Sequence, residues 1–170
     1  MEQNTPEISD ALNWYVAHTK SRAEKKLQQH CLREEIEVSL PCVVSVRKYQ
    51  SKVARFDVPL FPGYVFVRMP SFKKQSVLQS NYCARLLDVP DQVEFASQLQ
   101  DIHTAVSSDV EVCLAPQIVE GVRVVVKSGP LRGVEGFVEK RAGVVDVFLR
   151  LDFIAKAALV RMHVSELEAL

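Results

Sequence analysis

The residue types that most often carry out catalysis or hold metal ions are present in this chain, but their spacing suits neither task. The sequence contains no glycine-rich phosphate loop and no nucleophile–base set. Asp57 and Asp88 have no visible acidic partner and are more simply explained as turn residues. The histidines, which lack the spacing of metal ligands, are His18, His30, His103 and His163. We therefore expect a protein that is not an enzyme and that needs no metal or other cofactor.

The cysteines indicate packing rather than reactivity. Each lies among apolar residues and none forms a Cys-x-x-Cys pair; they are Cys31, Cys42, Cys83 and Cys113. We expect all four to be small buried hydrophobic residues, because disulfides are rare in the reducing cytoplasm. No apolar run approaches the roughly 18–20 residues needed to cross a bilayer, and Met1–Asp10 lacks the apolar segment of a secretory signal. The sequence predicts a cytoplasmic monomer with no membrane partner.

Clustered cations offer a different chemistry, because they can neutralise a polyanion. The chain has no net charge, yet residues 1–85 hold 13 Lys and Arg against 8 Asp and Glu, whereas residues 86–170 hold 8 against 13. This asymmetry suggests that the first half faces a polyanion, and ordinary solvated surface is the alternative. A predicted hairpin in the first half is especially basic, with Arg47, Lys48, Lys52 and Arg55.

Aromatic side chains gather at a turn-rich loop over residues 59–63 and in the strand that follows it. Strand alternation places Tyr64 and Phe66 on one face and two valines on the other, so that both faces are apolar. One face is expected to pack on the protein's own helices, and the other needs a partner or a neighbouring element. The alternative is that Phe61, Tyr64 and Phe66 are simply core residues.

The elements that must position these residues fall into two groups. Residues 1–12 are expected to be a disordered tail. The strands expected after it are Asn13–Thr19, Ile36–Leu40, Val43–Tyr49, Val53–Val58, Tyr64–Met69 and Cys83–Val89. The expected helices begin at Ser21, cover Phe72–Gln79 and cover Phe95–Ser107. Strands interleaved with helices predict an α+β domain over residues 13–108, with an antiparallel sheet flanked by helices.

For two of the helices, the sequence also predicts which residues are buried. Ser21-Arg22-Ala23-Glu24 fits a capping box at the start of the first helix. Its expected buried stripe is Ala23, Leu27 and Cys31. The buried face of the last helix is expected to contain Phe95, Leu99, Ile102 and Val106.

The second group of elements is all-β. Residues 109–120 lack periodicity and are interpreted as a linker. The short β-type runs after it are Val122–Val126, Glu135–Lys140, Val144–Leu151 and Ala157–Met162. Glycines mark the turns between them. Residues 121–170 are therefore predicted to form a small β-barrel.

Several of these motifs are similar to those of the NusG family of transcription elongation factors. The similar motifs are Trp14-Tyr15-Val16, Glu24, the loop and strand from Pro59 to Val67, and Gly121 to Gly136. The last of them resembles the opening of the family's KOW domain, which has an SH3-like barrel. The resemblance covers residues 13–170 and implies an N-terminal domain that grips the clamp helices of RNA polymerase and approaches the non-template DNA strand. Closing the polymerase cleft in this way disfavours pausing.

The resemblance implies three sets of binding residues. Those for RNA polymerase are His18, Phe61, Tyr64 and Phe66, with Lys73, Lys74, Gln75 and Ser76 on a loop facing the opposing lobe. Those for DNA are Lys20, Arg22, Lys25, Lys26, His30 and Asn81. Those for a partner of the KOW domain, which in the family is termination factor Rho or a ribosomal protein, are Phe153, Ile154 and Lys156.

The KOW domain departs from the family's general member, which has Phe-Gly-Arg-x-Thr-Pro-Val-Glu before the last strand. The matching stretch here is Ile154–Arg161, in which Ala155 and Lys156 replace the glycine and the arginine. Lysine does not reproduce the guanidinium fork. The departure resembles specialised relatives such as RfaH and UpxY-type factors and implies an operon-specific antitermination factor. The alternatives are a general NusG acting in elongation, Rho-dependent termination and coupling to translation, and an RNA-binding or ribosome-associated KOW protein.

In RfaH the equivalent domain can switch between a helical hairpin and a barrel. Here Ala155–Leu159 are strong helix formers, whereas Val144–Leu149 are β-branched and alternating. Glycines in the turns favour the barrel and penalise a helix. We expect a constitutive barrel that is tethered by residues 109–120 and moves independently of the N-terminal domain.

Overall fold

The computed structural model describes residues 11–115, 121–138 and 143–170. Most of the predicted tail, the end of the predicted linker and the end of the predicted strand Glu135–Lys140 lie outside these residues. The chain divides into two compact units. The first contains Met1–Leu40 and Pro62–Gln92, and the second contains Pro41–Phe61 and Val93–Leu170.

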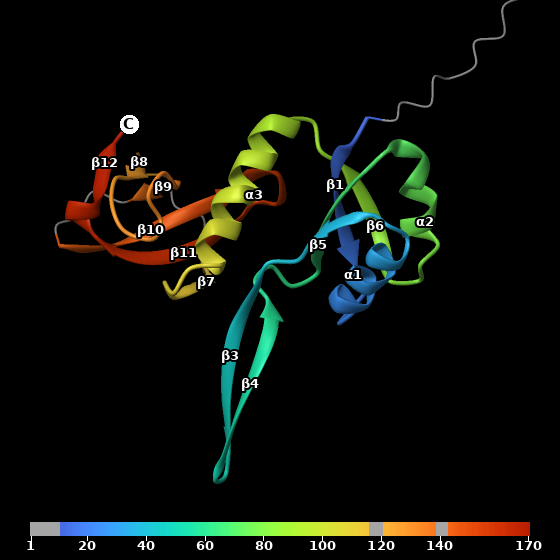
Figure 1. Cartoon of the computed structure of the whole chain (residues 1–170), viewed down its shortest axis with the longest axis horizontal. Helices are drawn as coiled ribbons and strands as arrows, with labels where there is room; N and C mark the ends of the chain where they lie inside the picture. The colour runs from blue at the N-terminus through green and yellow to red at the C-terminus, as the bar shows by residue number, and fades with distance from the viewer. Residues whose placement is uncertain (1–10, 116–120, 139–142) are drawn as a thin grey trace, which may run out of the picture. The chain divides into compact units, whose positions relative to one another are not determined.

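The first unit is built on a four-stranded antiparallel sheet in the order β2-β5-β1-β6. The strands are β1 (Asn13–Thr19), β2 (Glu37–Ser39), β5 (Tyr64–Met69) and β6 (Cys83–Asp88). The helices are α1 (Glu24–Arg33), a 3-10 turn η1 (Ser71–Lys73) and α2 (Lys74–Leu78), which Figure 1 shows beside the sheet. An antiparallel sheet with flanking helices confirms the predicted fold class of this part.

The two central strands, β1 and β5, carry the core of the first unit. They pair from Asn13 opposite Met69 to His18 opposite Tyr64. Val65, Phe66 and Val67 have no solvent exposure, although successive side chains point to opposite faces of the sheet. Both faces of β5 are therefore covered at these positions, which explains the apolar run from Tyr64 to Val67.

The first helix begins in a different way from the prediction. Helix α1 starts at Glu24 with Ala23 as its N-cap, and no side chain caps it. Ser21 lies in a turn before the helix, and Arg22 adopts a left-handed conformation with φ of 56°. The predicted capping box is wrong, because the Glu24 carboxylate accepts a hydrogen bond from Gly63 instead. The predicted stripe of Ala23, Leu27 and Cys31 is buried.

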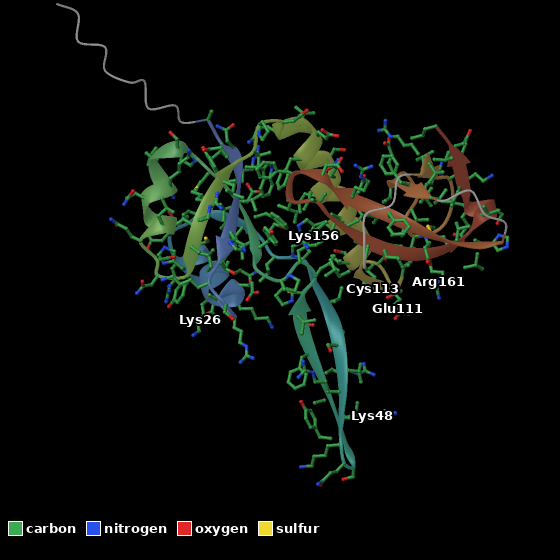
Figure 2. All side chains as sticks on the ribbon, turned by 180° about the vertical axis from the view of Figure 1, so that it is seen from behind. Lys26, Lys48, Glu111, Cys113, Lys156 and Arg161 are labelled. Atoms are coloured by element: carbon green, nitrogen blue, oxygen red, sulfur yellow. The ribbon has the colours of Figure 1, made fainter. Side chains whose placement is uncertain are left out.

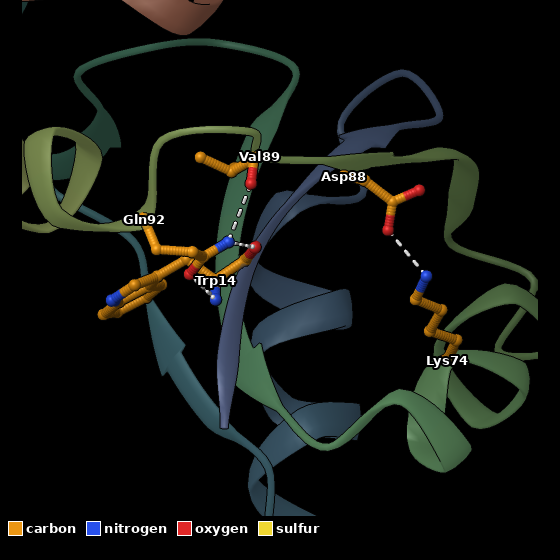
Figure 3. A network of polar contacts seen from close by, with 5 residues as sticks. All are labelled: Trp14, Lys74, Asp88, Val89 and Gln92. Carbon is orange, nitrogen blue, oxygen red and sulfur yellow. Dashed lines mark hydrogen bonds and ion pairs between the residues drawn. The ribbon is translucent and has the colours of Figure 1, made fainter. Parts of the chain in front are cut away.

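A side-chain amide extends the ladder of β1, as Figure 3 shows. Gln92 Oε1 accepts from the Trp14 backbone N–H at 2.6 Å, and Gln92 Nε2 donates to the Trp14 carbonyl at 2.9 Å. The same Nε2 also donates to the Val89 carbonyl at 2.9 Å. Gln92 thus satisfies backbone groups next to the last pair of β1 and β6, Tyr15 and Asp88. This contact lies at the first residue of α3 (Gln92–Val106), three residues before the predicted start.

The C-terminal part of the second unit is a six-stranded antiparallel sheet in the order β12-β8-β9-β10-β11-β7. Its strands are β7 (Val112–Leu114), β8 (Val122–Val126), β9 (Glu135–Val138), β10 (Val144–Leu151), β11 (Lys156–His163) and β12 (Leu167–Ala169). The 3-10 turns η2 (Asp152–Ile154) and η3 (Val164–Glu166) flank β11. The prediction of a C-terminal all-β domain is confirmed, and residues 144–162 are strands rather than helices apart from the η2 turn.

One strand of this sheet lies inside the segment interpreted as a linker. The three residues of β7 pair with β11 from Val112 opposite Val160 to Leu114 opposite Ala158. Periodicity could not reveal a strand this short, because two side chains on one face do not make a pattern. Within the sheet, Gly136 is required by close packing, since a Cβ there would lie 2.6 Å from Cγ1 of Val147.

Helix α3 contacts the C-terminal sheet domain within the second unit. Its buried residues are Phe95, Leu99, Ile102 and Ala105, so Ala105 takes the place predicted for Val106. The rings of Phe95 and Phe153 meet edge to face with centroids 6.3 Å apart. Gln98 Nε2 donates to Asp152 Oδ2 at 2.8 Å, and the Asp152 N–H donates back to Gln98 Oε1 at 3.0 Å. The expectation of a barrel that is tethered by residues 109–120 and moves independently of the N-terminal domain did not include these contacts.

The remaining part of the second unit is a two-stranded hairpin, β3 (Cys42–Tyr49) and β4 (Lys52–Pro59), drawn as a long ribbon in Figure 1. Its register runs from Cys42 opposite Pro59 to Tyr49 opposite Lys52, with the tip at residues 50–51. The hairpin was predicted, although each strand begins one residue earlier than expected and β4 also ends one residue later. Many hydrophobic side chains along it are exposed.

Candidate functional site

The loop before β5 is fixed to two neighbouring elements through a single residue, Gly63. Its N–H donates to Glu24 Oε1 in α1 at 2.9 Å. Its carbonyl accepts from the Thr19 N–H at the end of β1 at 2.8 Å. Gly63 has φ of 87°, a left-handed conformation that glycine adopts without the steric cost of a Cβ. Both backbone polar groups of Gly63 are therefore used, and they connect the loop to α1 and β1.

The aromatic pair next to this loop consists of His18 and Tyr64, which lie opposite each other at the ends of β1 and β5. Their ring centroids are 5.3 Å apart and the rings are tilted by 45°. His18 is exposed and Tyr64 is half-buried. The pair presents a rigid, partly apolar surface with polar atoms at its rim, the kind of surface that anchors protein–protein contacts.

The other two predicted groove residues lie in the interior. Phe61 is 2% exposed and Phe66 is fully buried. Their burial agrees with the alternative that these rings are core residues. The structure therefore brings His18 and Tyr64 together at the surface, whereas Phe61 and Phe66 are buried.

Most of the predicted DNA-binding residues lie on exposed positions of the first unit. Lys25 and Lys26 are exposed on α1, and Figure 2 labels Lys26. Arg22 is exposed in the turn before the helix. Lys20 Nζ lies 3.5 Å from Oδ1 of Asn81, so these two residues from different segments are adjacent. The local arrangement is a group of cations with one amide beside it.

His30 differs from the other members of that set, because it joins α1 to α2. Its Nε2 lies 3.1 Å from the Ser76 carbonyl and 3.3 Å from Ser76 Oγ. One ring nitrogen is therefore engaged inside the protein, and only the other could read a base. The resemblance places Ser76 in a different set, the residues that face the opposing lobe of the polymerase. In the structure, however, His30 and Ser76 are neighbours.

The remaining lobe-facing residues include two lysines with partners inside the protein. Lys73 Nζ donates to the carbonyls of Glu34 and Glu35, at 2.9 and 3.3 Å, just after the end of α1. Lys74 Nζ pairs with Asp88 at 2.6 Å (Figure 3) and lies 4.7 Å from the centroid of the Tyr15 ring. The hydrogen bond to Asp88 raises the pKa of Lys74. Gln75 is exposed.

The predicted partner-binding residues of the C-terminal domain lie at η2 and the start of β11. Phe153 is half-buried against Phe95, Ile154 is 8% exposed, and Lys156, labelled in Figure 2, is exposed. Ala155, at the position where the family has glycine, has φ of 52°. The backbone thus keeps the left-handed turn, although alanine is strained there.

The cysteines differ in their surroundings. Cys31 and Cys83 are buried, Cys42 is half-buried and Cys113 is exposed, so the expectation that all four are buried fails for Cys113 and holds only in part for Cys42. Burial raises the pKa of Cys31 to about 11, with a further contribution from Cys83, and burial also raises the pKa of Cys83. Both buried thiols are poor nucleophiles. Among the described residues, no group of three or more His, Cys, Asp or Glu could hold a metal ion.

The hairpin has binding features that the sequence reading identified only by charge. Five of its large apolar side chains are 46–60% exposed: Val44, Val46, Tyr49, Val53 and Phe56. The sequence contains a signal for these exposed apolar residues, because neither strand shows the alternation of apolar and polar residues that is typical of a sheet with one solvated face.

None of the helices that the structure describes is long and apolar enough to cross a membrane.

Comparison with known proteins identifies a family and a number of similar solved structures, including the two that follow. The family model described as transcription termination factor nusG matches residues 12–111. A structure of Thermotoga maritima NusG, whose subject is domain interaction, shares 24% identity over 94% of this chain and 97% of that chain, with a TM-score of 0.50. A structure of the MjSpt4:Spt5 complex shares 15% identity over 92% and 96%, and its TM-score of 0.29 is too low to indicate a common arrangement. No curated protein matches.

Proposed function

Because this chain belongs to the NusG family of non-enzymatic transcription factors, we propose that it binds the clamp helices of RNA polymerase and suppresses pausing or termination. The proposal rests chiefly on one observation, the surface pair of His18 and Tyr64 beside a loop that Gly63 fixes at both of its backbone polar groups. In this proposal the protein is a cytoplasmic monomer that acts by binding alone.

The rigidity of this surface favours binding to another protein. Tyr64 lies in a central strand, and its neighbour Gly63 is hydrogen-bonded to both α1 and β1. A ring held in this way loses little conformational entropy when a partner covers it. Phe66, buried below in the same strand, keeps Tyr64 in its register. An apolar and aromatic surface of this kind is complementary to the exposed side chains of a helical pair.

The cations of the first unit support a second contact, to the non-template DNA strand. Arg22, Lys25 and Lys26 are exposed, and Lys20 lies beside Asn81. Phosphates are neutralised by clustered cations, whereas a base edge needs a placed donor or acceptor such as the Asn81 amide. The proposal gives Lys73 and Lys74 a smaller share, because their ammonium groups already have partners.

We propose an operon-specific role rather than a general one because residues at the end of η2 and the start of β11 differ from those of general family members. Lys156 replaces the arginine of general family members, and Ala155 replaces the glycine. Arg161 is paired with Asp146 at 3.0 Å instead of being free for a partner. We expect weak binding to Rho or to a ribosomal protein through Phe153, Ile154 and Lys156, and therefore antitermination without a general termination activity.

The polymerase contact can be tested with the full chain and core RNA polymerase. Tyr64→Ala should weaken binding by at least about 2 kcal/mol, the scale of an interface hot spot. Val93→Ala, an exposed apolar residue of α3, is the matched control and should bind as the unchanged protein does. Equal affinity of the Tyr64 variant, with an unaltered circular dichroism spectrum, would remove the groove assignment.

The DNA contact and the specialised role have separate readouts. Charge reversal at Lys20 and Arg22 should reduce recruitment to a paused elongation complex and make the salt dependence of binding shallower. An unchanged salt slope would show that these residues do not face DNA. In a transcription assay with Rho, the protein should increase read-through, and stimulation of termination would favour the general NusG alternative.

A further inference from the structure

The β3–β4 hairpin has the composition of a core element and the exposure of a surface element. It is a separate two-stranded sheet, and isolated hairpins are at best marginally stable in water. Along it, Val44 and Val53 are each 60% exposed and Tyr49 is 54% exposed. Apolar side chains this exposed add little to the stability of the fold, so their arrangement is better explained by binding to a ligand.

The register assigns each side chain to one of two faces, because residues directly opposite each other share a face. Tyr49 is opposite Lys52, Arg47 is opposite Ala54, and Ser45 is opposite Phe56. We call the side chains of these three pairs the aromatic face. The other face contains valines at positions 44, 46 and 53, with Lys48, Arg55 and Asp57 among them.

On the aromatic face, cations and rings alternate. Lys52 lies directly across from Tyr49, and Arg47 lies between Tyr49 and Phe56 along the ribbon. At roughly 3.4 Å per residue, the two rings are about 14 Å apart along the strands. Small residues, Ser45 and Ala54, fill the remaining positions and leave both rings accessible. Flat apolar groups separated by positive charge match the alternation of bases and phosphates in a single strand.

The charge of the hairpin points to a polyanion. Residues 42–59 contain four cations and one carboxylate. Among the described residues, no ion pair and no side-chain hydrogen bond involves Arg47, Lys48, Lys52 or Arg55. Arginines of the C-terminal sheet differ: Arg123, Arg150 and Arg161 are each paired with a carboxylate. Figure 2 shows the side chains standing out on both sides of the ribbon, with Lys48 labelled.

We propose that the aromatic face of the β3–β4 hairpin binds single-stranded RNA, with bases stacked on Tyr49 and Phe56 and phosphates neutralised by Arg47 and Lys52. A duplex would engage the cations but would leave both rings unused, since its bases are already stacked. The choice of RNA over DNA rests on the proposed function. In a transcribing complex the α1 surface is assigned to the non-template strand, and the transcript is the remaining single strand.

Binding of a fluorescein-labelled twelve-nucleotide RNA without secondary structure to the full chain tests this inference in the absence of polymerase. Tyr49→Leu and Phe56→Leu keep apolar bulk in the hairpin, and each should weaken binding by about 5- to 100-fold, the range of one stacked base. Tyr49→Phe should retain binding, because stacking needs the ring and not the hydroxyl. Val44→Thr on the other face is the control and should leave the affinity unchanged.

The proposed contacts of Arg47 and Lys52 with phosphates are tested by a separate measurement. The pair Arg47→Ala and Lys52→Ala should make the log–log dependence of affinity on salt shallower by about 1.4, two phosphates at about 0.7 each. Amide chemical shifts of Val46 and Val53 report whether the hairpin persists in each variant. This experiment uses no polymerase, so its failure is distinguishable from failure of the Tyr64 test.

Three outcomes would overturn the proposal. The first is equal affinity of the leucine variants and the unchanged protein with the hairpin intact, which would exclude stacking. The second is binding of double-stranded RNA as tightly as single-stranded RNA. The third is equal or tighter binding of a DNA strand of the same sequence, which would exclude the transcript as the preferred ligand.

Discussion

Between α3 and the C-terminal sheet, aromatic and polar side chains find partners within the second unit, whereas along the β3–β4 hairpin of the same unit they face solvent. Phe95 and Phe153 meet edge to face, and Gln98 exchanges two hydrogen bonds with Asp152. Phe56 on the hairpin is 46% exposed. Residue type therefore does not separate a side chain that stabilises the fold from one that is available to a ligand; the presence of an internal partner does.

The sharpest test of this comparison replaces one phenylalanine from each region. Phe95→Ala should lower the free energy of unfolding by about 3–4 kcal/mol, because Phe95 is 2% exposed and its removal leaves a cavity. Phe56→Ala should cost less than about 1 kcal/mol. Urea denaturation of both variants measures the difference. A similar loss in the two proteins would mean that the hairpin is part of the stabilising core.

A second, smaller effect concerns pH. Burial raises the pKa of Asp101 in α3 to about 6, with an opposing hydrogen bond from the Glu135 N–H and a further rise from the Glu135 carboxylate. Since the folded-state pKa exceeds the unfolded value, stability should fall as pH rises from about 4 to about 6 and then level off. Asp101→Asn should lack this fall. Because Asp101 is half-exposed, solvent screens its charge, and the expected change in the free energy of unfolding is on the order of 1 kcal/mol.

Thermal melts of both proteins between pH 4 and pH 8 would measure that difference. The exposed carboxylate of the hairpin provides the control variant, Asp57→Asn. A constant gap between the Asp101 variant and the unchanged protein at every pH would contradict the predicted pKa.

The hydrogen bonds between Gln98 and Asp152 should have a local effect. Gln98→Ala removes both, and because they are exposed the cost should be at most about 1 kcal/mol. Amide hydrogen exchange should become faster at residues 152–154 and remain unchanged in β3 and β4. If exchange at η2 were unaffected, the C-terminal sheet domain would already be moving independently of α3.

The smallest expected effect is a gain in stability. Ala155 has φ of 52°, where an L-residue is strained, so Ala155→Gly should stabilise the C-terminal domain by about 0.5 kcal/mol. Gln50 at the hairpin tip has φ of 47° and provides a matched substitution. Gln50→Gly should shift the hairpin's own amide exchange and leave the melting temperature of the C-terminal domain unchanged. A loss of stability at residue 155 would indicate that the alanine methyl group makes a needed contact.

Local patterns were sufficient for the strands, because alternation and β-branching act within one segment. The strands Asn13–Thr19 and Tyr64–Met69 were predicted to the residue. The start of α1 and the first turn of α3 were missed for a common reason. Glu24 and Gln92 use their side chains on partners that are distant in sequence, Gly63 and Trp14, and no local motif encodes those contacts.

The candidate sites likewise contain features that local sequence patterns predicted and features that depend on contacts between distant residues. The adjacency of His18 and Tyr64 agrees with the sequence-based expectation of a surface at the end of β5. The burial of Phe61 and Phe66 could not be read from alternation, because it depends on what covers each face. The engagement of Lys73 and Lys74 likewise depends on the Glu34 carbonyl and on Asp88, which only the folded chain brings close.

The hairpin also presents free edges, because within the part of the chain that the structure describes β3 and β4 pair only with each other and no further strand takes up their outer backbone N–H and C=O groups. Val43-Val44-Ser45-Val46 contains three β-branched residues and is a segment of the kind that pairs edge to edge with other chains. The flanking cations Arg47, Lys48, Lys52 and Arg55 oppose such pairing through charge repulsion between copies. The charges proposed to attract a polyanion thus also keep the protein dispersed. Neutralising them should promote self-association at high protein concentration, and a polyanion bound along the ribbon would remove the same protection.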